Sequence, residues 1–464
     1  MHRSVLFCLA CLPVHLLVVA APTSNKLYNV HYGNDNVGKF WHISDLHLDP
    51  SYHVTKDPTK VCLSSSERPA FDPGAFGDYM CDSPYQLISS AFQFMKHQSP
   101  QPDFMIWTGD SPPHVQAEEL STQQVIDILA NTTHTIRELF PSLPVYPAVG
   151  NHDYWPQDQL PTTTNEIYQA VAKLWAGWLE PEALATLREG GFYSQLIRPQ
   201  LRLVSLNTIL YYGPNNVTEN MTDPAGQLKW LQNTLEASRQ NMEKVYIIAH
   251  VPIGYLPYAM DTTAMREVYN ERLVEMFRDY SDLISGQFYG HTHRDSIMVM
   301  LGRQGEPLGS VFVTPSITPW RGGRDAYSNN PAVRMYLYDP ADYGVQDVWQ
   351  YYLNLTEANR AGSPAWTMEY SLTQAFELPD ARPPSLHKLG LALAQPRSKA
   401  FRKYFNYFMV SFDDTITCEG FCKAIQVCSL LFVDRDSYSA CMKHQRGDGD
   451  SRLSSRLFHS AAIL

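Results

Sequence analysis

The stretch VGNHDYW, residues 149–155, ends the apolar run PVYPAV (144–149) and places Gly150, Asn151, His152 and Asp153 in a row. Glycine followed by asparagine is ordinary turn chemistry, so a structural turn is one interpretation of the stretch taken alone. Asparagine, histidine and aspartate can also bind metal ions or transfer protons. The rest of the chain decides between these interpretations.

Five further strand-like runs end in the same way, at a residue able to bind metal. They are KFWHIS (39–44) before Asp45, DFMIWT (103–108) before Gly109 and Asp110, LRLVSL (201–206) before Asn207, KVYIIA (244–249) before His250, and GQFYG (286–290) before His291. Segments with helical periodicity, such as 85–98 and 122–140, lie between several runs, and this alternation predicts an α/β fold with helices covering the sheets. Because ligands of open α/β sheets bind beyond the carboxyl ends of strands, these side chains should converge if the strands share a sheet.

The strand-end residues form a donor set of oxygen and imidazole groups without thiolates, which suits zinc, iron or manganese. Seven ligands exceed a single tetrahedral site but can serve two ions if Asp110 bridges them. One ion would take Asp45, His47, Asp110 and His293, and the other Asp110, Asn151, His250 and His291. Two cations ~3.5–4 Å apart can hold a hydroxide and clamp phosphate oxygens, so the set predicts phosphate-ester hydrolysis. A lone strand-end histidine is more often structural, but that reading does not explain all these elements in this order.

The motifs DLH (45–47), GD (109–110), GNHD (150–153), AH (249–250) and GHTH (290–293) resemble those of the calcineurin-like metallophosphoesterases. Flanking stretches, including FWHISDLHLDPSYH, MIWTGDSPPHV and GQFYGHTHRDS, resemble the acid sphingomyelinase-like phosphodiesterases, most closely the 3A type, and the similarity runs over nearly the whole chain. The resemblance implies a layered β-sandwich flanked by helices, a centre of two Zn²⁺ ions (Fe or Mn being possible), and phosphodiester hydrolysis by a metal-bound hydroxide.

The same resemblance implies roles for single residues. Asn151 binds the second metal, His152 is the general acid for the leaving oxygen, Asp153 stands behind His152 as its orienting partner, and His114 contacts the phosphate. Pro113 stands where purple acid phosphatases have a tyrosine, so a tyrosinate–iron site is not expected. No counterpart of the saposin domain of acid sphingomyelinase precedes Cys62, which favours soluble phosphodiesters and nucleotides, such as nucleoside triphosphates and CDP-choline, over lipids.

Composition and the N-terminus predict a secreted protein. The chain has 464 residues and a formal net charge of −11, so no long-range field draws it to nucleic acid or anionic membranes. A basic start, an apolar run and small residues near Ala20 predict a signal peptide over residues 1–20. No other segment is apolar enough to span a bilayer, so we expect no stable membrane anchor. Secretion is expected, with lysosomal delivery as the alternative.

Six of the eight cysteines follow the predicted signal peptide, and an even number in an oxidising compartment predicts disulfides. Proximity favours Cys62–Cys81 and two bridges among Cys418, Cys422, Cys428 and Cys441, although six cysteines formally allow fifteen pairings. Sequons predict glycans at Asn131, Asn216, Asn220 and Asn354.

The chain divides into two parts on pattern. We expect a catalytic domain over residues 38–340, whose later runs 296–301, 311–314 and 334–339 are typical of antiparallel strands. Residues 341–464 are expected to form a helical appendage that contains the cysteine cluster.

Other functions stay open on the sequence. A nuclease would share the motif set, but the acidic charge disfavours it. A sphingomyelin phosphodiesterase would expose an apolar patch beside its cleft. An inactive secreted binding glycoprotein would lack a metal ligand, and none is missing. We expect a monomeric enzyme that acts on a small phosphodiester or nucleotide and on no nucleic-acid polymer. Candidates for stacking on a base are Tyr154, Trp155, Tyr211, Tyr212 and Tyr255.

Overall fold

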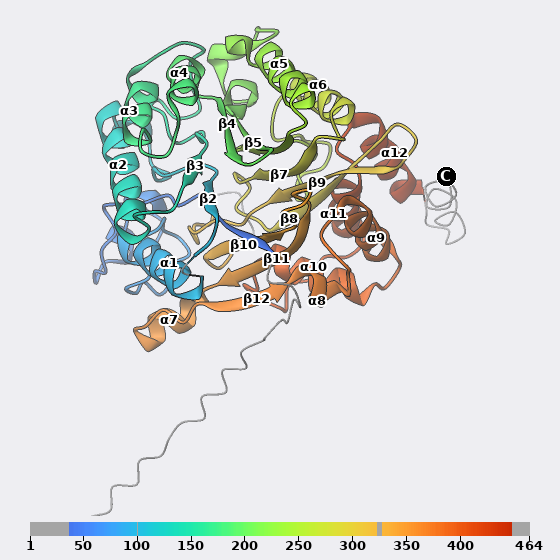
Figure 1. Ribbon diagram of the computed structural model, residues 1–464. Helices are drawn as coiled ribbons and strands as arrows, with labels where there is room; N and C mark the ends of the chain where they lie inside the picture. The colour runs from blue at the N-terminus through green and yellow to red at the C-terminus, as the bar shows by residue number, and fades with distance from the viewer. Residues whose placement is uncertain (1–36, 100, 323–326, 448–464) are drawn as a thin grey trace, which may run out of the picture. The chain divides into compact units, whose positions relative to one another are not determined.

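The computed structural model describes residues 37–99, 101–322 and 327–447 (Figure 1). The predicted signal peptide over residues 1–20 lies outside them. The described chain forms two six-stranded sheets with helices around them, which confirms the layered α/β fold. None of its helices has both the length and the apolar character that a membrane span requires.

The first sheet has the strand order β12-β11-β10-β1-β2-β3, and β1, β2 and β3 run parallel. The register pairs Ile43 with Trp107 and Trp107 with Pro147, so the three parallel strands end at the same edge. The strands are β1 (Gly38–Ile43), β2 (Phe104–Trp107), β3 (Val145–Pro147), β10 (Ala332–Tyr338), β11 (Val345–Tyr352) and β12 (Thr367–Ser371).

The second sheet has the order β4-β5-β6-β7-β9-β8, with β5, β6, β7 and β9 parallel and β4 and β8 antiparallel at the edges. Ile248 of β6 pairs with Phe288 of β7, so these strands also end together, just before His250 and His291. The strands are β4 (Tyr193–Arg198), β5 (Leu201–Leu206), β6 (Lys244–Ala249), β7 (Ile284–Tyr289), β8 (Ser296–Leu301) and β9 (Pro307–Val313).

The two sheets pack face to face through aromatic side chains. The ring of Phe40 on β1 lies 5.3 Å from that of Phe288 on β7, edge to face. Phe288 in turn lies 4.9 Å from Tyr336 on β10. The strand ends that carry polar residues are therefore divided between two sheets and do not share one. Face-to-face packing still brings both edges to the same place.

Helices flank the sheets, with α1–α4 on one side in Figure 1 and α9–α12 on the other. In α1, Leu87, Ala91 and Met95 recur every fourth residue and are buried, the pattern of an amphipathic helix. The helices are α1 (Tyr85–Gln98), α2 (Thr122–Leu139), α3 (Glu166–Leu174), α4 (Pro181–Gly190), α5 (Gln227–Gln240), α6 (Glu267–Asp279), α7 (Leu355–Ala361), α8 (Leu372–Phe376), α9 (Pro383–Ala394), α10 (Lys399–Phe408), α11 (Phe421–Leu431) and α12 (Arg435–Gly447).

The expected domain boundary near residue 340 falls inside the first sheet. β11 lies after it yet pairs along its length with β10, and β12 pairs with β11. Residues 341–464 are therefore not helical throughout, because two strands complete the sheet before α8 begins. The helical part contains the Cys418–Cys422 and Cys428–Cys441 disulfides, and Cys62–Cys81 ties a loop of the first sheet.

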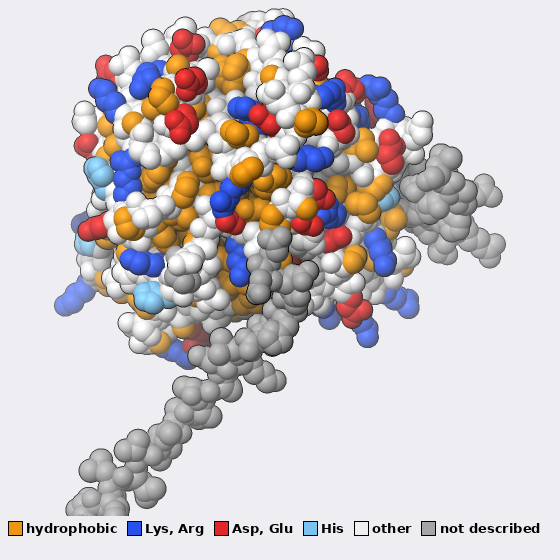
Figure 2. Space-filling view, in the orientation of Figure 1, with side chains coloured by type: hydrophobic (Ala, Val, Ile, Leu, Met, Phe, Trp, Pro, Cys, Tyr) orange, Lys and Arg blue, Asp and Glu red, His pale blue; other side chains and the backbone are white. Residues whose placement is uncertain are grey.

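The surface carries mixed charge on the face that Figure 2 shows, where Lys and Arg side chains are interspersed with Asp and Glu. This face has no broad basic area of the kind that binds a nucleic-acid polymer. The four sequon asparagines, Asn131, Asn216, Asn220 and Asn354, are all exposed, as attachment of a glycan requires.

Candidate active site

Five residues at the strand ends have positive φ although none is glycine. The angles are 51° at Asp45, 43° at His47, 59° at Asp110, 74° at His291 and 60° at His293. Such a conformation costs about 1–3 kcal/mol per residue and persists where the surrounding structure enforces it, often at functional sites. Here it turns each chain sharply after its strand and aims the side chains at a common centre.

Gly150 follows β3 at a position where the Asp110 carboxylate leaves no room for a side chain. A Cβ atom at this position would lie 2.1 Å from Oδ1 of Asp110. The same oxygen accepts a hydrogen bond of 2.8 Å from the backbone N–H of His152, so the carboxylate has little freedom to move. The glycine is needed because the Asp110 carboxylate packs directly against the backbone.

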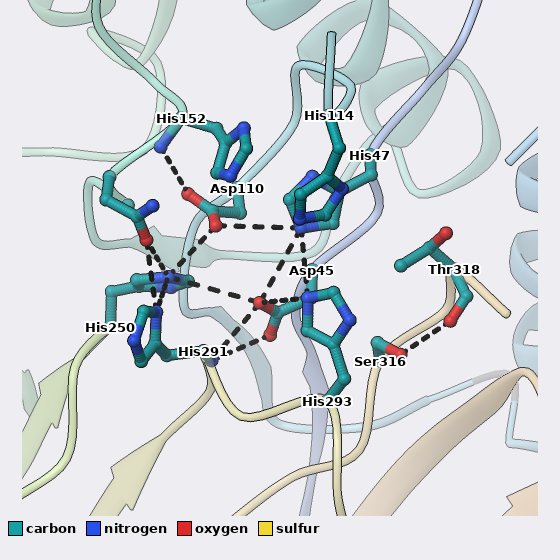
Figure 3. A network of polar contacts seen from close by, with 12 residues as sticks. Asp45, His47, Asp110, His114, His152, His250, His291, His293, Ser316 and Thr318 are labelled. Carbon is teal, nitrogen blue, oxygen red and sulfur yellow. Dashed lines mark hydrogen bonds and ion pairs between the residues drawn. The ribbon is translucent and has the colours of Figure 1, made fainter. Parts of the chain in front are cut away.

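The first group of donors comes from both sheets. Asp45 Oδ1 lies 3.4 Å from His293 Nε2 and 3.8 Å from His47 Nε2. His47 Nε2 lies 3.2 Å from His293 Nε2 and 3.6 Å from Asp110 Oδ2. Figure 3 shows these side chains pointing toward one another.

The second group shares Asp110 with the first. His250 Nε2 lies 3.0 Å from Asp110 Oδ2 and 2.9 Å from Asn151 Oδ1. His291 Nδ1 lies 3.1 Å from Asn151 Oδ1 and 3.2 Å from His250 Nε2. Asp110 Oδ2 thus belongs to both groups, as a bridging ligand would.

These spacings fit two divalent ions. Donors placed tetrahedrally around an ion at ~2.0–2.1 Å lie about 3.3 Å from one another. The observed separations scatter around that value, and the donor atoms are those that bind zinc, iron or manganese. The residues therefore fit a dinuclear centre.

Outer contacts fix the donors in place. His47 Nδ1 bonds the carbonyl of Pro112 at 2.8 Å and His250 Nδ1 that of Thr108 at 2.7 Å, which leaves each Nε2 facing the centre. The amide nitrogen of Asn151 donates to Asp158 at 2.9 Å, so its oxygen faces His250 and His291. Such contacts are typical of metal ligands.

Asp153 has a different place from the one expected. Its carboxylate accepts backbone hydrogen bonds from Gly150, Asp110 and Ser111 at 2.8–2.9 Å. Among the described residues it makes no hydrogen bond to the ring of His152. Asp153 therefore connects the two loops that carry Asp110 and Asn151. No contact in the described chain supports the expected role of Asp153 in orienting His152.

The electrostatics of the cluster favour cations. Burial alone would lower the pKa of His250, but the Asp110 carboxylate raises it to about 9. His47 shows the same balance, with burial opposed by the nearby carboxylates of Asp45 and Asp110, and its pKa is also raised to about 9. Two buried carboxylates thus favour positive charge at the centre, which bound metal ions would supply in place of protons.

His152 and His114 lie beside the first group on its open side. The ring of His114 is 4.0 Å from that of His47 and 4.3 Å from that of His152. His114 Nδ1 lies 3.1 Å from the carboxylate of Asp82, and its ring stacks on Trp320 at 3.7 Å. Both rings therefore lie close to that of His47, at 4.0 Å for His114 and 4.8 Å for His152.

A cleft of about 600 Å³ opens from the cluster toward the C-terminal helices. His114, His291 and His293 line its inner end, and Tyr258, Trp320, Tyr327 and residues of α10 and α11 form its walls. Arg294 also lines it, and its guanidinium donates to the carbonyls of Tyr327 and Ser328. The cleft therefore combines metal donors, aromatic faces and a positive charge.

Comparison with known proteins agrees with this geometry. The calcineurin-like phosphoesterase family matches residues 38–295, and the acid sphingomyelin phosphodiesterase C-terminal region matches residues 306–448. The chain is 57% identical to the rat protein named cyclic GMP-AMP phosphodiesterase SMPDL3A, covering 89% of this chain and 93% of that protein. The human protein of the same name is also 57% identical, over 88% of this chain and 90% of that protein. Human acid sphingomyelinase-like phosphodiesterase 3b is 41% identical, over 87% of this chain and 90% of that protein.

The chain belongs to the acid sphingomyelinase-like phosphodiesterases.

As a member of this family the protein is a phosphoric diester hydrolase with a dinuclear metal site. The resemblance read from the five motifs is confirmed.

Sequence reasoning missed several residues of this acid sphingomyelinase-like phosphodiesterase. Asp82 and Trp320 hold His114 from two sides, but neither lies in a strand-end motif. Tyr211 and Tyr255, expected as stacking candidates, are buried against Tyr269 and Tyr438 instead. Among those candidates Tyr212 comes near the site, with its ring 4.9 Å from that of His291. The aromatic walls of the cleft come from Tyr258, Trp320 and Tyr327, which are distant in sequence and meet beside the metal cluster only in the folded chain.

Asn207, which also follows a strand, takes no part in the cluster. Its amide donates to the hydroxyl of Tyr168 and the carbonyl of Gly190, so it is a structural residue.

Proposed function

We propose that this enzyme hydrolyses phosphodiester and phosphoanhydride bonds of nucleotides, including cyclic dinucleotides of the cyclic GMP-AMP type, nucleoside triphosphates and CDP-choline. The observation that carries the proposal is the aromatic-walled cleft that opens directly onto the His and Asp cluster. Tyr258, Trp320 and Tyr327 offer ring faces on which a base can stack. The names of relatives at 57% identity support the cyclic dinucleotide.

The proposed ligands of the two ions are Asp45, His47, Asp110 and His293 for one, and Asp110, Asn151, His250 and His291 for the other. When bound, two such ions neutralise phosphate charge and activate water. Water would then form a bond to phosphorus and release a proton to solvent, while the bond from phosphorus to the leaving oxygen breaks. His152 donates a proton to that oxygen, and His114, held by Asp82, donates a hydrogen bond to the phosphate.

The proposed ions are Zn²⁺, because four imidazoles with carboxylate and amide oxygens at tetrahedral spacing suit zinc. Metal analysis of the purified protein should give about two zinc ions per chain. Detection of Fe or Mn instead would contradict the assignment of zinc but not the proposed ligands.

We also infer that the protein is secreted or lysosomal, glycosylated and monomeric. Three disulfides, which persist in oxidising compartments, and exposed sequons support the first two inferences. Removal of glycans with a glycosidase should lower the mass of secreted protein, and sedimentation should give the mass of one chain.

The test is product analysis by mass spectrometry. Secreted protein is incubated at pH 5 to 7 with cyclic GMP-AMP, ATP, CDP-choline and sphingomyelin vesicles in parallel, with the Asp110→Asn variant as a control. Cleavage of nucleotides by the wild type alone is the expected result. Cleavage of no nucleotide would contradict the proposal.

Sphingomyelin hydrolysis is the second candidate, because exposed apolar residues do lie beside the cleft. Tyr258, Tyr327 and Phe421 line it, and each side chain is between 43% and 49% exposed. Such residues can contact lipid as well as a base. Release of ceramide and phosphocholine from the vesicles, with nucleotides intact, would favour this candidate.

A further inference from the structure

A second pocket lies beside the cleft in the C-terminal helical region. Its volume is about 840 Å³, and it is lined by α10, the start of α11 and the segments that precede them. No residue of the metal cluster lines it. The catalytic roles proposed above therefore leave this pocket without a function.

The pocket is strongly basic in a chain whose net charge is −11. Its lining contains Arg397, Lys399, Arg402 and Lys423, against one carboxylate, that of Glu419. Within the described part of the chain, none of these four cations has an ion-pair partner. Lys423 is held over the ring of Phe401 at 5.1 Å and donates to the carbonyl of Gln395, so its charge stays at the pocket.

The fold adds positive partial charge at the same place. α10 begins at Lys399 and α11 at Phe421, and Lys399, Gly420 and Lys423 of these first turns line the pocket. Backbone N–H groups in a first helical turn carry partial positive charge. The cationic side chains and the backbone N–H groups of these first turns therefore both favour an anion in the pocket.

The pocket and the cleft adjoin each other along α10. Phe405 of α10 lines both cavities, and Arg402 lies three residues before it, about one turn away. The Cys418–Cys422 disulfide joins a residue of the pocket to a residue of the cleft across a Cα separation of 5.3 Å. A ligand bound at the metal cluster can extend along the cleft toward these cations.

We propose that this pocket binds a phosphate group, and that in the substrate complex this is a phosphate other than the one being cleaved. Guanidinium and ammonium groups are the side chains that bind phosphate most strongly, and an anion is the ligand that four cations without ion-pair partners would stabilise. The proposal rests on the proposed function, because it assumes a substrate with more than one phosphate. It makes the pocket a determinant of substrate specificity outside the catalytic machinery.

The test compares two substrates in the zinc-loaded enzyme. Lys399→Glu/Arg402→Glu should raise KM for ATP about tenfold with kcat unchanged, since binding alone is weakened. Hydrolysis of bis(4-nitrophenyl) phosphate, which has one phosphate, should not change. Lys399→Gln/Arg402→Gln should give a smaller change in the same direction.

The matched control is Lys388→Glu/Lys403→Glu, which changes the net charge equally on α9 and α10 but lies outside the pocket. It should leave KM for both substrates at the wild-type value. An unchanged KM for ATP in the pocket variant, or an equal rise in the control, would overturn the assignment to a substrate phosphate.

A binding measurement separates this proposal from the proposed function. If the wild type cleaves bis(4-nitrophenyl) phosphate but no nucleotide, the proposed function fails. Calorimetry with inorganic tripolyphosphate should then still find one more site in the wild type than in Lys399→Glu/Arg402→Glu. Equal numbers of sites would overturn the pocket as a phosphate site.

Discussion

Asp110 is the residue at which the two halves of the metal cluster meet. Its Oδ2 lies 3.0 Å from His250 and 3.6 Å from His47, while its Oδ1 is held by the backbone of His152. Asp45 Oδ1 also lies 4.0 Å from His250 Nε2, but Asp110 Oδ2 approaches the same nitrogen to 3.0 Å. Loss of this one oxygen should therefore affect both ions.

Asp110→Asn is expected to abolish phosphodiesterase activity and to lower bound metal below two ions per chain. An amide oxygen lacks the charge needed to bridge two cations. Rates with bis(4-nitrophenyl) phosphate and metal content by mass spectrometry are the readouts. Full activity with both metals retained would contradict the bridging role.

Asp82 acts through His114 and is a positioning residue. Its carboxylate accepts from the His114 backbone at 2.6 Å and from Thr318 Oγ1 at 2.9 Å, and lies 3.1 Å from His114 Nδ1. Asp82→Asn should reduce kcat/KM about 10–100-fold with metal content unchanged, because the ring is no longer held. His114→Ala should have a similar effect. The double variant should be no worse than either single variant, whereas additive losses would show that the two residues act separately.

At the scale of elements, β12 carries a partly buried acid, Glu369, at the edge of the first sheet. Ser411 Oγ donates to Glu369 Oε1 at 2.6 Å, while Oε2 is buried and without a hydrogen-bond partner in the described chain. Burial raises the pKa of Glu369 well above its ordinary value. The folded protein therefore holds this proton more tightly than the unfolded chain does. The ordinary pKa of glutamate is 4.5, which applies to the unfolded chain. The free energy of unfolding therefore rises as the pH falls from the pKa of Glu369 in the folded protein toward 4.5.

Glu369→Gln should remove that dependence, because the amide has no charge to bury. The variant should unfold at a higher temperature than the wild type at pH 7.5, by a few degrees, and by less at pH 5. Thermal unfolding followed by circular dichroism at the two pH values measures the difference. A variant less stable than the wild type at both would show that the carboxylate is needed in its charged form.

Elements were predicted best where local pattern and tertiary role agree. The helical periodicity of residues 85–98 and 122–140 predicted α1 and, to within one residue, α2, because buried apolar residues recur on one face. β11 and β12 were missed because their place is set by pairing with β10, a contact that local sequence does not contain. The walls of the cleft were missed for the same reason.

At the scale of the whole molecule, the proposed metal centre joins the two sheets. Asp45, Asp110 and Asn151 follow strands of the first sheet, while His250, His291 and His293 follow strands of the second. Ions bound to all of them link the sheets at one edge. Ions that bind the folded state alone add stability according to their affinity and concentration.

Chelation should therefore lower the unfolding temperature as well as abolish activity. Dialysis against a strong chelator, followed by calorimetric unfolding, is expected to show a fall that added zinc reverses. The control is Asp110→Asn, which should start from a lower unfolding temperature and respond less to the chelator. An unchanged unfolding temperature in the wild type would mean that the sheets need no metal link.

The cleft is assembled from separate stretches of chain, which supply the metal donors and most of the walls respectively. The donors lie between residues 45 and 293, whereas α10 and α11, which form much of the far wall, lie after residue 398. The chemistry thus depends on residues up to 293, while the choice of substrate depends mainly on Trp320, Tyr327, α10 and α11, which follow them in the chain. Mutation can revise the second without touching the first, so a lineage can acquire new substrates while every intermediate remains a working hydrolase.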